Sequence, residues 1–358
     1  MSAPINTLIL GASYGSLLAT KLVLAGHDAT LICLPAEREL INAEGVIVRM
    51  PVRGRDDLVE LNSKDAPGSL RAVAPEEVDP AEFDMIALAM QEPQYRSDGV
   101  RELLDAIARS GKPVMSIMNM PPLPFLARIP GLDMDALAAC YTDASVWASF
   151  NPDNVTLASP DPQAFRPPEE PVNVLQVSLP TNFKVARFAD DAATDLMRRM
   201  QADIEAIRHT VDGAQVELPV KLKVHESVFV PLAKWCMLLT GNYRCVQSEE
   251  MRAIRDAVHA DLDASKTVYE WVRHLCIDIG ASPDDMVPFE KYANAASGLA
   301  KPSSAARALA AGAPNIERVD KIVQTIAAAH GKSLPEVDAI VALVEQWLRR
   351  NREAQQAA

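Results

Sequence analysis

At the start of the chain, short strand-like segments alternate with a turn and with a segment of helical spacing. The first strand-like segment, Asn6 to Leu10, is followed by a turn of small residues, Gly11 to Ser16. Leucines then recur at helical spacing up to Gly26, a residue that commonly ends helices, and a second apolar run covers Ala29 to Leu34. A strand, a glycine turn, a helix and a second strand in this order predict the opening of a βαβ unit.

The same alternation continues through the first half of the chain. Further apolar runs predict strands, and segments with helical periodicity separate several of them, so we expect a parallel sheet with helices on both faces. A proline-rich stretch at 160–171 interrupts this part of the sequence. The predicted strands are 85–90, 114–118, 155–157, 172–179 and 183–188, and the predicted helices are 101–109 and 191–208.

The second half of the chain changes in character. From about Lys221 onward the period-two pattern almost disappears, and glycines and prolines separate helical stretches. The sequence therefore predicts an α/β Rossmann-type domain over residues 1–215 and an all-α domain over residues 216–358. The expected helices are 222–240, 248–279, 286–297, 303–311, 315–330 and 334–354.

Composition narrows the class of protein and of partner. The 358 residues include 48 acidic and 35 basic side chains, a formal charge of −13, and 49% are hydrophobic. This hydrophobic content is typical of a chain that buries a core, and the negative charge argues against nucleic acid or an anionic membrane as a partner. The sequence has no long apolar run and no export signal, and its five cysteines are scattered, so we expect a cytoplasmic protein with reduced thiols.

The glycine turn is the first candidate for chemistry. It reads Gly11-Ala12-Ser13-Tyr14-Gly15-Ser16, whereas the dinucleotide fingerprint is G-x-G-x-x-G between a strand and a helix. Ser13 replaces the second glycine, and the last glycine comes one residue early at Gly15. The position after the first strand predicts nucleotide binding by Gly11, Ser13, Tyr14, Gly15 and Ser16, although a plain tight turn would read similarly.

The end of the second strand normally distinguishes NAD from NADP. An acidic side chain there favours a free ribose hydroxyl, and an arginine favours a 2′-phosphate. Here the strand ends at Cys33 and Leu34, and both Glu37 and Arg38 follow shortly afterwards. Either of them could turn toward the ribose, so the sequence leaves the choice between NADP and NAD open.

The stretch from Gly11 to Val48, GASYGSLLATKLVLAGHDATLICLPAERELINAEGVIV, resembles the opening of the ketopantoate reductases (2-dehydropantoate 2-reductases). The resemblance is weaker along the rest of the chain. It implies a Rossmann domain followed by a helical domain of the type also found in 6-phosphogluconate dehydrogenase. It also implies reduction of a 2-keto acid by NADPH in a cleft between the two domains.

The resemblance assigns roles to several later residues. Met118-Asn119-Met120 retains the Asn of a family motif but loses its Gly. Lys234 and Asn242 match the catalytic Lys and a later Asn on the first long helix of the second domain. Read from the residues alone, Asn119 could equally be a turn residue, and Lys234 could be a solvated charge on a helix.

Near the C-terminus the resemblance implies a Ser and, twelve residues later, a Glu. The corresponding residues are Ser303 and Asn315, so the Glu is absent unless a two-residue slip brings Glu317 into its place. Ser303 also follows Pro302, where an N-cap alone would explain it. The loss of the Glu argues against ketopantoate itself as the substrate.

Cofactor-side positions depart from the family pattern as well. Leu34 stands where the family has an Arg, and in Met90-Gln91 the Gln stands where the family has a Lys. The resemblance therefore implies an NAD(P)-dependent oxidoreductase acting on a small carbonyl, hydroxyl or imine compound that carries a carboxylate. The alternative is a non-redox descendant that uses the same cleft for ligand binding, regulation or cofactor-independent chemistry. No Cys, His and acidic residues have the spacing of a metal site. Apolar stripes on the C-terminal helices could form a homodimer surface, and a monomer fits the sequence nearly as well.

Overall fold

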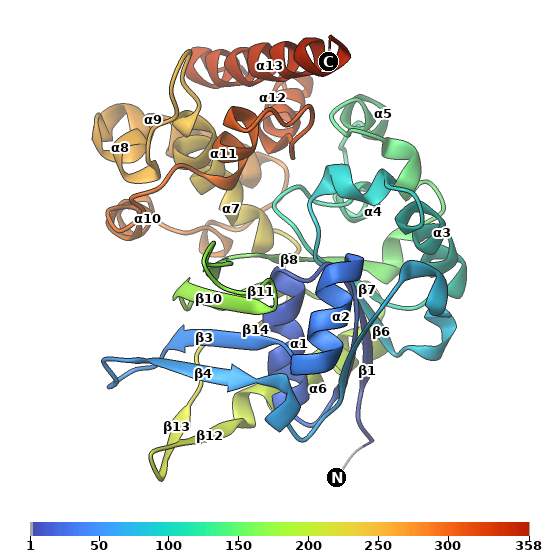
Figure 1. The fold of residues 1–358 in the computed structure, drawn as a ribbon. Coiled ribbons are helices and arrows are strands. Elements are labelled where there is room, and N and C mark those ends of the chain that lie inside the picture. The colour runs from blue at the N-terminus through green and yellow to red at the C-terminus, as the bar shows by residue number, and fades with distance from the viewer. Residues whose placement is uncertain (1–2, 358) are drawn as a thin grey trace. The chain divides into compact units, whose positions relative to one another are not determined.

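The computed structural model describes residues 3–357 (Figure 1). The backbone forms two compact units. The N-terminal unit contains the residues up to Met90 together with Gln94–Phe125 and Val146–Glu226. The C-terminal unit contains Gln91–Pro93, Leu126–Ser145 and the chain from Ser227 onward. The predicted domain boundary between residues 215 and 216 stays a prediction.

An eight-stranded sheet forms the centre of the N-terminal unit, in the order β14-β11-β8-β7-β6-β1-β2-β5. The neighbouring strands β8-β7-β6-β1-β2-β5 are all parallel, and β11 pairs with β8 in the antiparallel direction. The chain runs outward from β1 through β2 to β5 and then returns to β6 on the other side of β1. The carboxyl ends of β1 and β6 therefore form the switch point at which open α/β sheets bind ligands. The bounds are β1 Asn6–Leu10, β2 Asp28–Ile32, β5 Leu70–Val73, β6 Met85–Leu88, β7 Val114–Ile117, β8 Val155–Ser159, β11 Phe183–Ala186 and β14 Leu222–His225.

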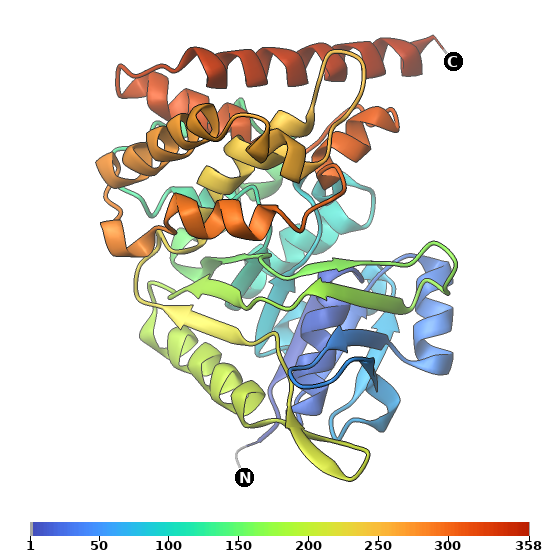
Figure 2. The same cartoon turned by 90° about the vertical axis from the view of Figure 1, so that its left-hand side faces the viewer.

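A second sheet of four strands, in the order β4-β3-β10-β9, belongs to the same unit. Its strands are β3 Ile47–Pro51, β4 Leu58–Asn62, β9 Gln163–Phe165 and β10 Val174–Leu179. Figure 2 shows these strands and the separate yellow hairpin of β12 (Arg208–Val211) and β13 (Ala214–Glu217). The proline-rich stretch thus contributes an edge strand and the turn that leads into β10.

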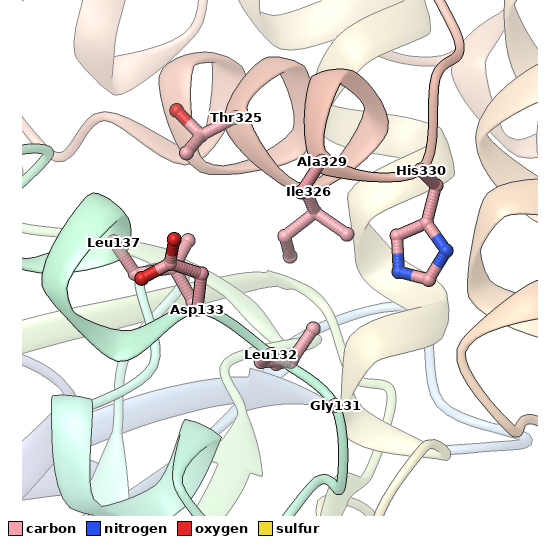
Figure 3. A pocket seen from close by; sticks show the side chains of 8 residues that line it. All are labelled: Gly131, Leu132, Asp133, Leu137, Thr325, Ile326, Ala329 and His330. Atoms are coloured by element: carbon pink, nitrogen blue, oxygen red, sulfur yellow. The ribbon is translucent and has the colours of Figure 1, made fainter.

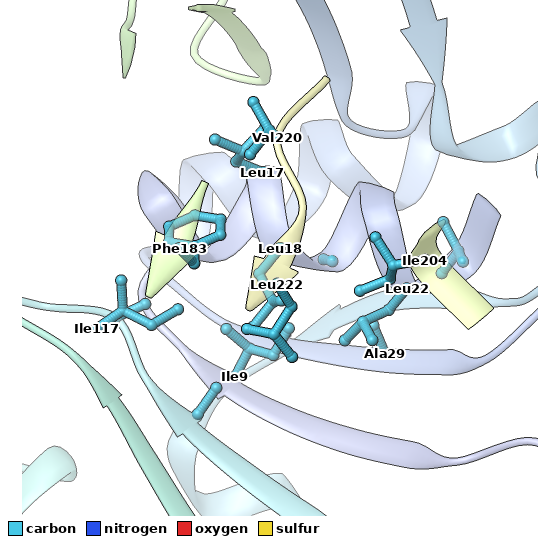
Figure 4. Close-up of a cluster of buried hydrophobic side chains, with 14 of the residues drawn as sticks. Ile9, Leu17, Leu18, Leu22, Ala29, Ile117, Phe183, Ile204, Val220 and Leu222 are labelled. Atoms are coloured by element: carbon cyan, nitrogen blue, oxygen red, sulfur yellow. The ribbon is translucent and has the colours of Figure 1, made fainter. Parts of the chain in front are cut away.

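Helix α1 (Tyr14–Leu24) packs against strands of both sheets and against α6 (Asp191–Ala206). Its leucines form the middle of the core, where Leu17, Leu18 and Leu22 meet apolar side chains from the strands (Figure 4). Nine of its eleven residues are buried, so the helix has little amphipathic character despite its regular leucines. The other helices before the C-terminal unit's main segment are α2 Pro35–Glu44, α3 Val100–Ser110, α4 Leu123–Leu126 and α5 Met134–Ala138.

The C-terminal unit is helical, as the sequence predicts. The bounds are α7 Lys234–Met237, α8 Ile254–His259, α9 Leu262–Asp278, α10 Phe289–Ala296, α11 Ser304–Ala310, α12 Val319–Ala329 and α13 Pro335–Gln356. The predicted helix 248–279 is two helices, because Asp261 caps the N-terminus of α9 by accepting a hydrogen bond from the N–H of Ala264 (2.9 Å).

The predicted helix over 222–240 is wrong in its first part. Leu222–His225 is strand β14, which pairs in parallel with β11 and joins the large sheet. Its apolar residues, Leu222 and Val224, alternate with Lys223 and His225, but four residues are too few to reveal a strand beside a strong helical signal. Pairing with a strand almost forty residues earlier in the sequence, rather than local propensity, sets this conformation.

Candidate functional site

The glycine turn lies at the switch point of the large sheet. Gly11 follows β1 with a φ of +102°, and its N–H donates to the carbonyl of Ile32 at the end of β2 (2.9 Å). A Cβ on Gly11 would lie 2.6 Å from Cγ of Met90 and 2.8 Å from the carbonyl oxygen of Ala89. Gly11 is therefore required both for the backbone conformation and for the close approach of the residues that follow β6.

Gly15 has a different role, although it comes one residue earlier than the fingerprint requires. A Cβ at this position would lie 2.8 Å from Cγ2 of Ile9, so the glycine allows α1 to pack closely on β1. The first N–H groups of a helix have no acceptor within the helix, and α1 begins at Tyr14. Ser13 is exposed, while the Ser16 hydroxyl donates to the Ala12 carbonyl (2.7 Å). Gly11 and Gly15 thus supply the tight turn and the close packing that a dinucleotide site needs.

Residues Pro160–Arg166, here called the strap, run from the end of β8 through β9 and pass beside this turn. The hydroxyl of Tyr14 donates to the carbonyl of Pro162 (3.1 Å), and the Tyr14 ring meets Phe183 edge to face at 6.5 Å between centroids. Tyr14 therefore holds the strap at the first residue of α1. No feature of the sequence connects the strap with the glycine turn, because the two lie almost 150 residues apart.

Arg166 ends the strap and joins two parts of the candidate nucleotide site. One guanidinium nitrogen, Nη2, donates to the carbonyl oxygen of Ala12 in the glycine turn (2.7 Å). The other, Nη1, pairs with the carboxylate of Glu37 in the first turn of α2. The Glu37 side chain is only 13% exposed, and its second oxygen accepts the N–H of Leu34 (3.3 Å). A carboxylate and a guanidinium thus lie together between the end of β2 and the glycine turn.

The two charged residues after β2 turn in different directions. Glu37 faces Arg166 and the glycine turn, whereas Arg38 pairs with Glu77, which follows β5, at 3.1 Å. Leu34 is 69% exposed, an unusual environment for a large apolar side chain. The carboxylate, not the arginine of α2, therefore lies beside the turn.

The residues after β6 and β7 also lie at the carboxyl edge of the large sheet. Met90 follows β6, is half-buried, and its N–H donates to the buried hydroxyl of Tyr95 (3.0 Å). Asn119, two residues beyond β7, is half-buried, and Gln91, which follows Met90 and belongs to the C-terminal unit, is exposed. This is the edge at which the sequence predicts cofactor and substrate contacts.

Lys234 and Asn242 lie in one continuous helical segment of the C-terminal unit. Lys234 begins α7, and Leu238–Asn242 form a π-helical turn directly after α7. In a regular α-helix, residues eight apart would differ by about 80° around the axis, but one extra residue in a turn reduces this to about 20°. The π-turn therefore brings the half-buried Lys234 and Asn242 onto nearly the same face of the segment.

Ser303 is an N-cap. Its hydroxyl oxygen accepts the N–H of Ala306 (3.1 Å) and donates to the carbonyl of Asn242 (2.7 Å), and the residue is 3% exposed. The side chain therefore begins α11 and fastens it to the π-turn. Asn315 accepts a hydrogen bond from Arg352 at 3.2 Å, and Glu317 is 8% exposed.

A small pocket in the C-terminal unit lies between α12 and the loop before α5 (Figure 3). It has room for about one water molecule, which is too little for a substrate. The residues that line this pocket are Gly131, Leu132, Asp133, Leu137, Thr325, Ile326, Ala329 and His330.

Within residues 3–357 no three or more Cys, His, Asp or Glu side chains gather as metal ligands, and no helix is long and apolar enough to span a bilayer.

The chain matches known proteins in its fold but not in its sequence. No family model and no curated protein sequence matches the chain. Solved structures do match over nearly the whole length. A 2-dehydropantoate 2-reductase from Methylococcus capsulatus is 14% identical with a TM-score of 0.64, over 97% of this chain and 98% of that one. A dimeric ketopantoate reductase from Staphylococcus aureus is 12% identical with a TM-score of 0.61, over 97% and 100%.

A third similar structure is that of a D-mandelate dehydrogenase in a ternary complex with NADH and anilino(oxo)acetate. It is 14% identical with a TM-score of 0.63, over 97% of this chain and 99% of that one. The order of strands in the large sheet and the helical unit that follows agree with these matches. The chain therefore has the fold of the ketopantoate reductases.

Proposed function

We propose that the protein is a nicotinamide-dependent oxidoreductase that acts on a small carbonyl or hydroxyl compound carrying a carboxylate. The observation that carries this proposal is the glycine turn. Added Cβ atoms on Gly11 and Gly15 would collide with the residues after β6 and with β1, so both glycines serve a close-packed turn at the N-terminus of α1. Backbone N–H groups at such a helix start are suited to a pyrophosphate.

The residues at the carboxyl edge fit the rest of such a cofactor. The N-terminus of α1 would hold the pyrophosphate, the region of Glu37 and Leu34 the adenosine ribose, and Met90 and Asn119 the nicotinamide end. A bound nicotinamide supplies or accepts a hydride. Similar folds in a ketopantoate reductase and in a D-mandelate dehydrogenase complex with NADH support this reaction class.

Lys234 is the candidate acid–base residue. An ammonium group can bind a substrate carboxylate or donate a proton to a carbonyl oxygen as the adjacent carbon is reduced. Because of the π-turn, Asn242 would lie on nearly the same face as Lys234, and its amide would then hold a substrate oxygen. The proposal requires that Lys234 and a nicotinamide held by the glycine turn reach one substrate. The Ser303 hydroxyl would support this arrangement indirectly, through its bond to the Asn242 carbonyl.

The test combines binding with turnover. NADH and NADPH are titrated separately, and 2-keto acids are then screened by the loss of reduced-cofactor absorbance. We expect Lys234→Ala to reduce turnover by about 10²-fold or more while cofactor affinity and thermal unfolding stay unchanged. Lys291→Ala, which removes an exposed lysine of the same unit, is the matched control. Unchanged turnover in Lys234→Ala would remove this lysine from the mechanism.

One observation favours a second candidate, a non-redox ligand-binding protein. Tyr14 and Arg166 both attach the strap to the glycine turn, through the carbonyl of Pro162 and the carbonyl of Ala12. If the strap does not yield, neither cofactor will bind at millimolar concentration, and this second candidate replaces the first. We propose a homodimer only by analogy with the dimeric Staphylococcus aureus enzyme. Sedimentation at several concentrations tests that state.

A further inference from the structure

We propose that the ion pair between Arg166 and Glu37 makes the protein selective for NAD(H) over NADP(H), and that Arg166 is a phosphate-binding cation masked by Glu37. This inference rests on the proposed function, since it assigns a cofactor to the same site. It concerns residues from two segments almost 130 positions apart, the strap and the first turn of α2. Both segments belong to the N-terminal unit.

The position of Glu37 carries the first step. Its carboxylate accepts the N–H of Leu34 at the start of α2, so the carboxylate lies where that helix would otherwise attract an anion. The ribose of a dinucleotide bound at a glycine turn lies beside the end of the second strand. A ribose 2′-hydroxyl can donate to a carboxylate there, whereas a 2′-phosphate would be repelled by it.

No other cation in the first turn of α2 offsets this repulsion. Leu34 is uncharged and exposed, and Arg38 is paired with Glu77 beyond β5. The cation that does lie beside Glu37 is Arg166, and the carboxylate neutralises it. The ion pair of Glu37 and Arg166 therefore suits the neutral ribose hydroxyls of NAD(H) better than the 2′-phosphate dianion of NADP(H).

Arg166 retains the capacity to bind a phosphate. A guanidinium has five N–H donors, and the bonds to Glu37 and to the Ala12 carbonyl account for two of them. Its side chain is 29% exposed, and its contact with Ala12 holds it beside the glycine turn. Removal of the Glu37 charge should therefore convert Arg166 from a masked cation into a site for the 2′-phosphate.

The test is a double-mutant cycle read by calorimetric titration with NADH and NADPH. The measured quantity is the ratio of the NADPH Kd to the NADH Kd in wild type, E37Q, R166Q and the double variant. We expect wild type to bind NADH more tightly, and E37Q to lower the ratio by about tenfold or more. R166Q should raise the ratio, and the double variant should lose most of the change produced by E37Q. The glutamine in E37Q can still accept the N–H of Leu34, so the start of α2 is preserved.

Three controls isolate the charge effect. R49Q removes an arginine of the same unit that pairs with Glu60 and Glu170 on the small sheet, and it should leave the ratio unchanged. Thermal unfolding of every variant shows that the fold is retained. R166K keeps the positive charge and should return the ratio to near the wild-type value, which a purely structural role of the guanidinium would not predict.

Several outcomes would overturn the inference. A wild type that prefers NADPH, a single ratio shared by all four proteins, or an E37Q effect that persists without Arg166 each contradicts it. If R166Q binds both cofactors more tightly and equally so, Arg166 only holds the strap closed. A complete lack of binding to either cofactor in all four proteins is a different result, because it refutes the proposed function itself.

Discussion

A buried lysine in α1 provides the sharpest prediction about stability. Lys21 is 1% exposed, and its ammonium donates to the carbonyl of Pro219 at 2.9 Å. Burial, together with the nearby charge of Lys221, lowers the pKa of Lys21 from 10.5 to about 7. The bonded carbonyl precedes Val220, which has a left-handed φ of +62° that a β-branched residue rarely adopts. Lys21 therefore combines an energetic cost with a structural contact.

The sign of the effect follows from proton linkage. Between pH 7 and 10.5 the unfolded chain keeps the Lys21 proton while the folded protein releases it, so this group makes the protein more stable as the pH rises. Below pH 7 both states are charged, and the full penalty of burial applies. The lowering of the Lys21 pKa from 10.5 to about 7 corresponds to about 5 kcal/mol in the free energy of unfolding. About 2 kcal/mol of this change falls between pH 7.5 and 9.

The assay is urea unfolding of wild type and Lys21→Met at several pH values. We expect the difference in unfolding free energy between the two proteins to change by about 2 kcal/mol from pH 7.5 to 9, in favour of the variant at the lower pH. Loss of the bond to Pro219 lowers the stability of the variant by about 1 kcal/mol at every pH. Lys223→Met, at a lysine whose side chain is 37% exposed, should show no such pH dependence. Parallel curves for wild type and Lys21→Met would refute the reasoning.

Two further sites, one in each unit, test a close helix–strand contact and a buried ion pair. Gly15→Ala places a Cβ 2.8 Å from Ile9 Cγ2, so we expect a loss of about 1–3 kcal/mol in urea unfolding, and an unchanged midpoint would show that α1 can shift without cost. Arg318→Ala leaves Asp320, which is fully buried, without the guanidinium that donates to both of its oxygens at 3.0 Å. We expect a loss of about 3–5 kcal/mol, and Arg318→Ala together with Asp320→Ala should recover part of it, whereas additive losses would contradict a coupled pair.

Sequence patterns alone predict the order of the elements around the glycine turn and the change to a helical second half. Asn6–Leu10, the glycine turn and the leucines of α1 could be predicted because each is a local pattern with a period of its own. The sequence also identified Glu37 and Arg38 as the alternatives after the second strand, without choosing between them. The strands at 47–51, 58–62 and 70–73 were not predicted, because they are short and lie among charged and turn-forming residues.

How distant segments of the chain meet follows from the tertiary structure and not from local sequence patterns. Strand β14 forms by pairing with β11. Arg166 contacts Ala12 and Glu37 because the strap passes beside the glycine turn. No sequence motif predicts the π-turn between Lys234 and Asn242, and helices α8, α9 and α12 pack against it. Side-chain periodicity reports which face of an element is buried, but it contains no information about which residue from another part of the chain will fill the space opposite.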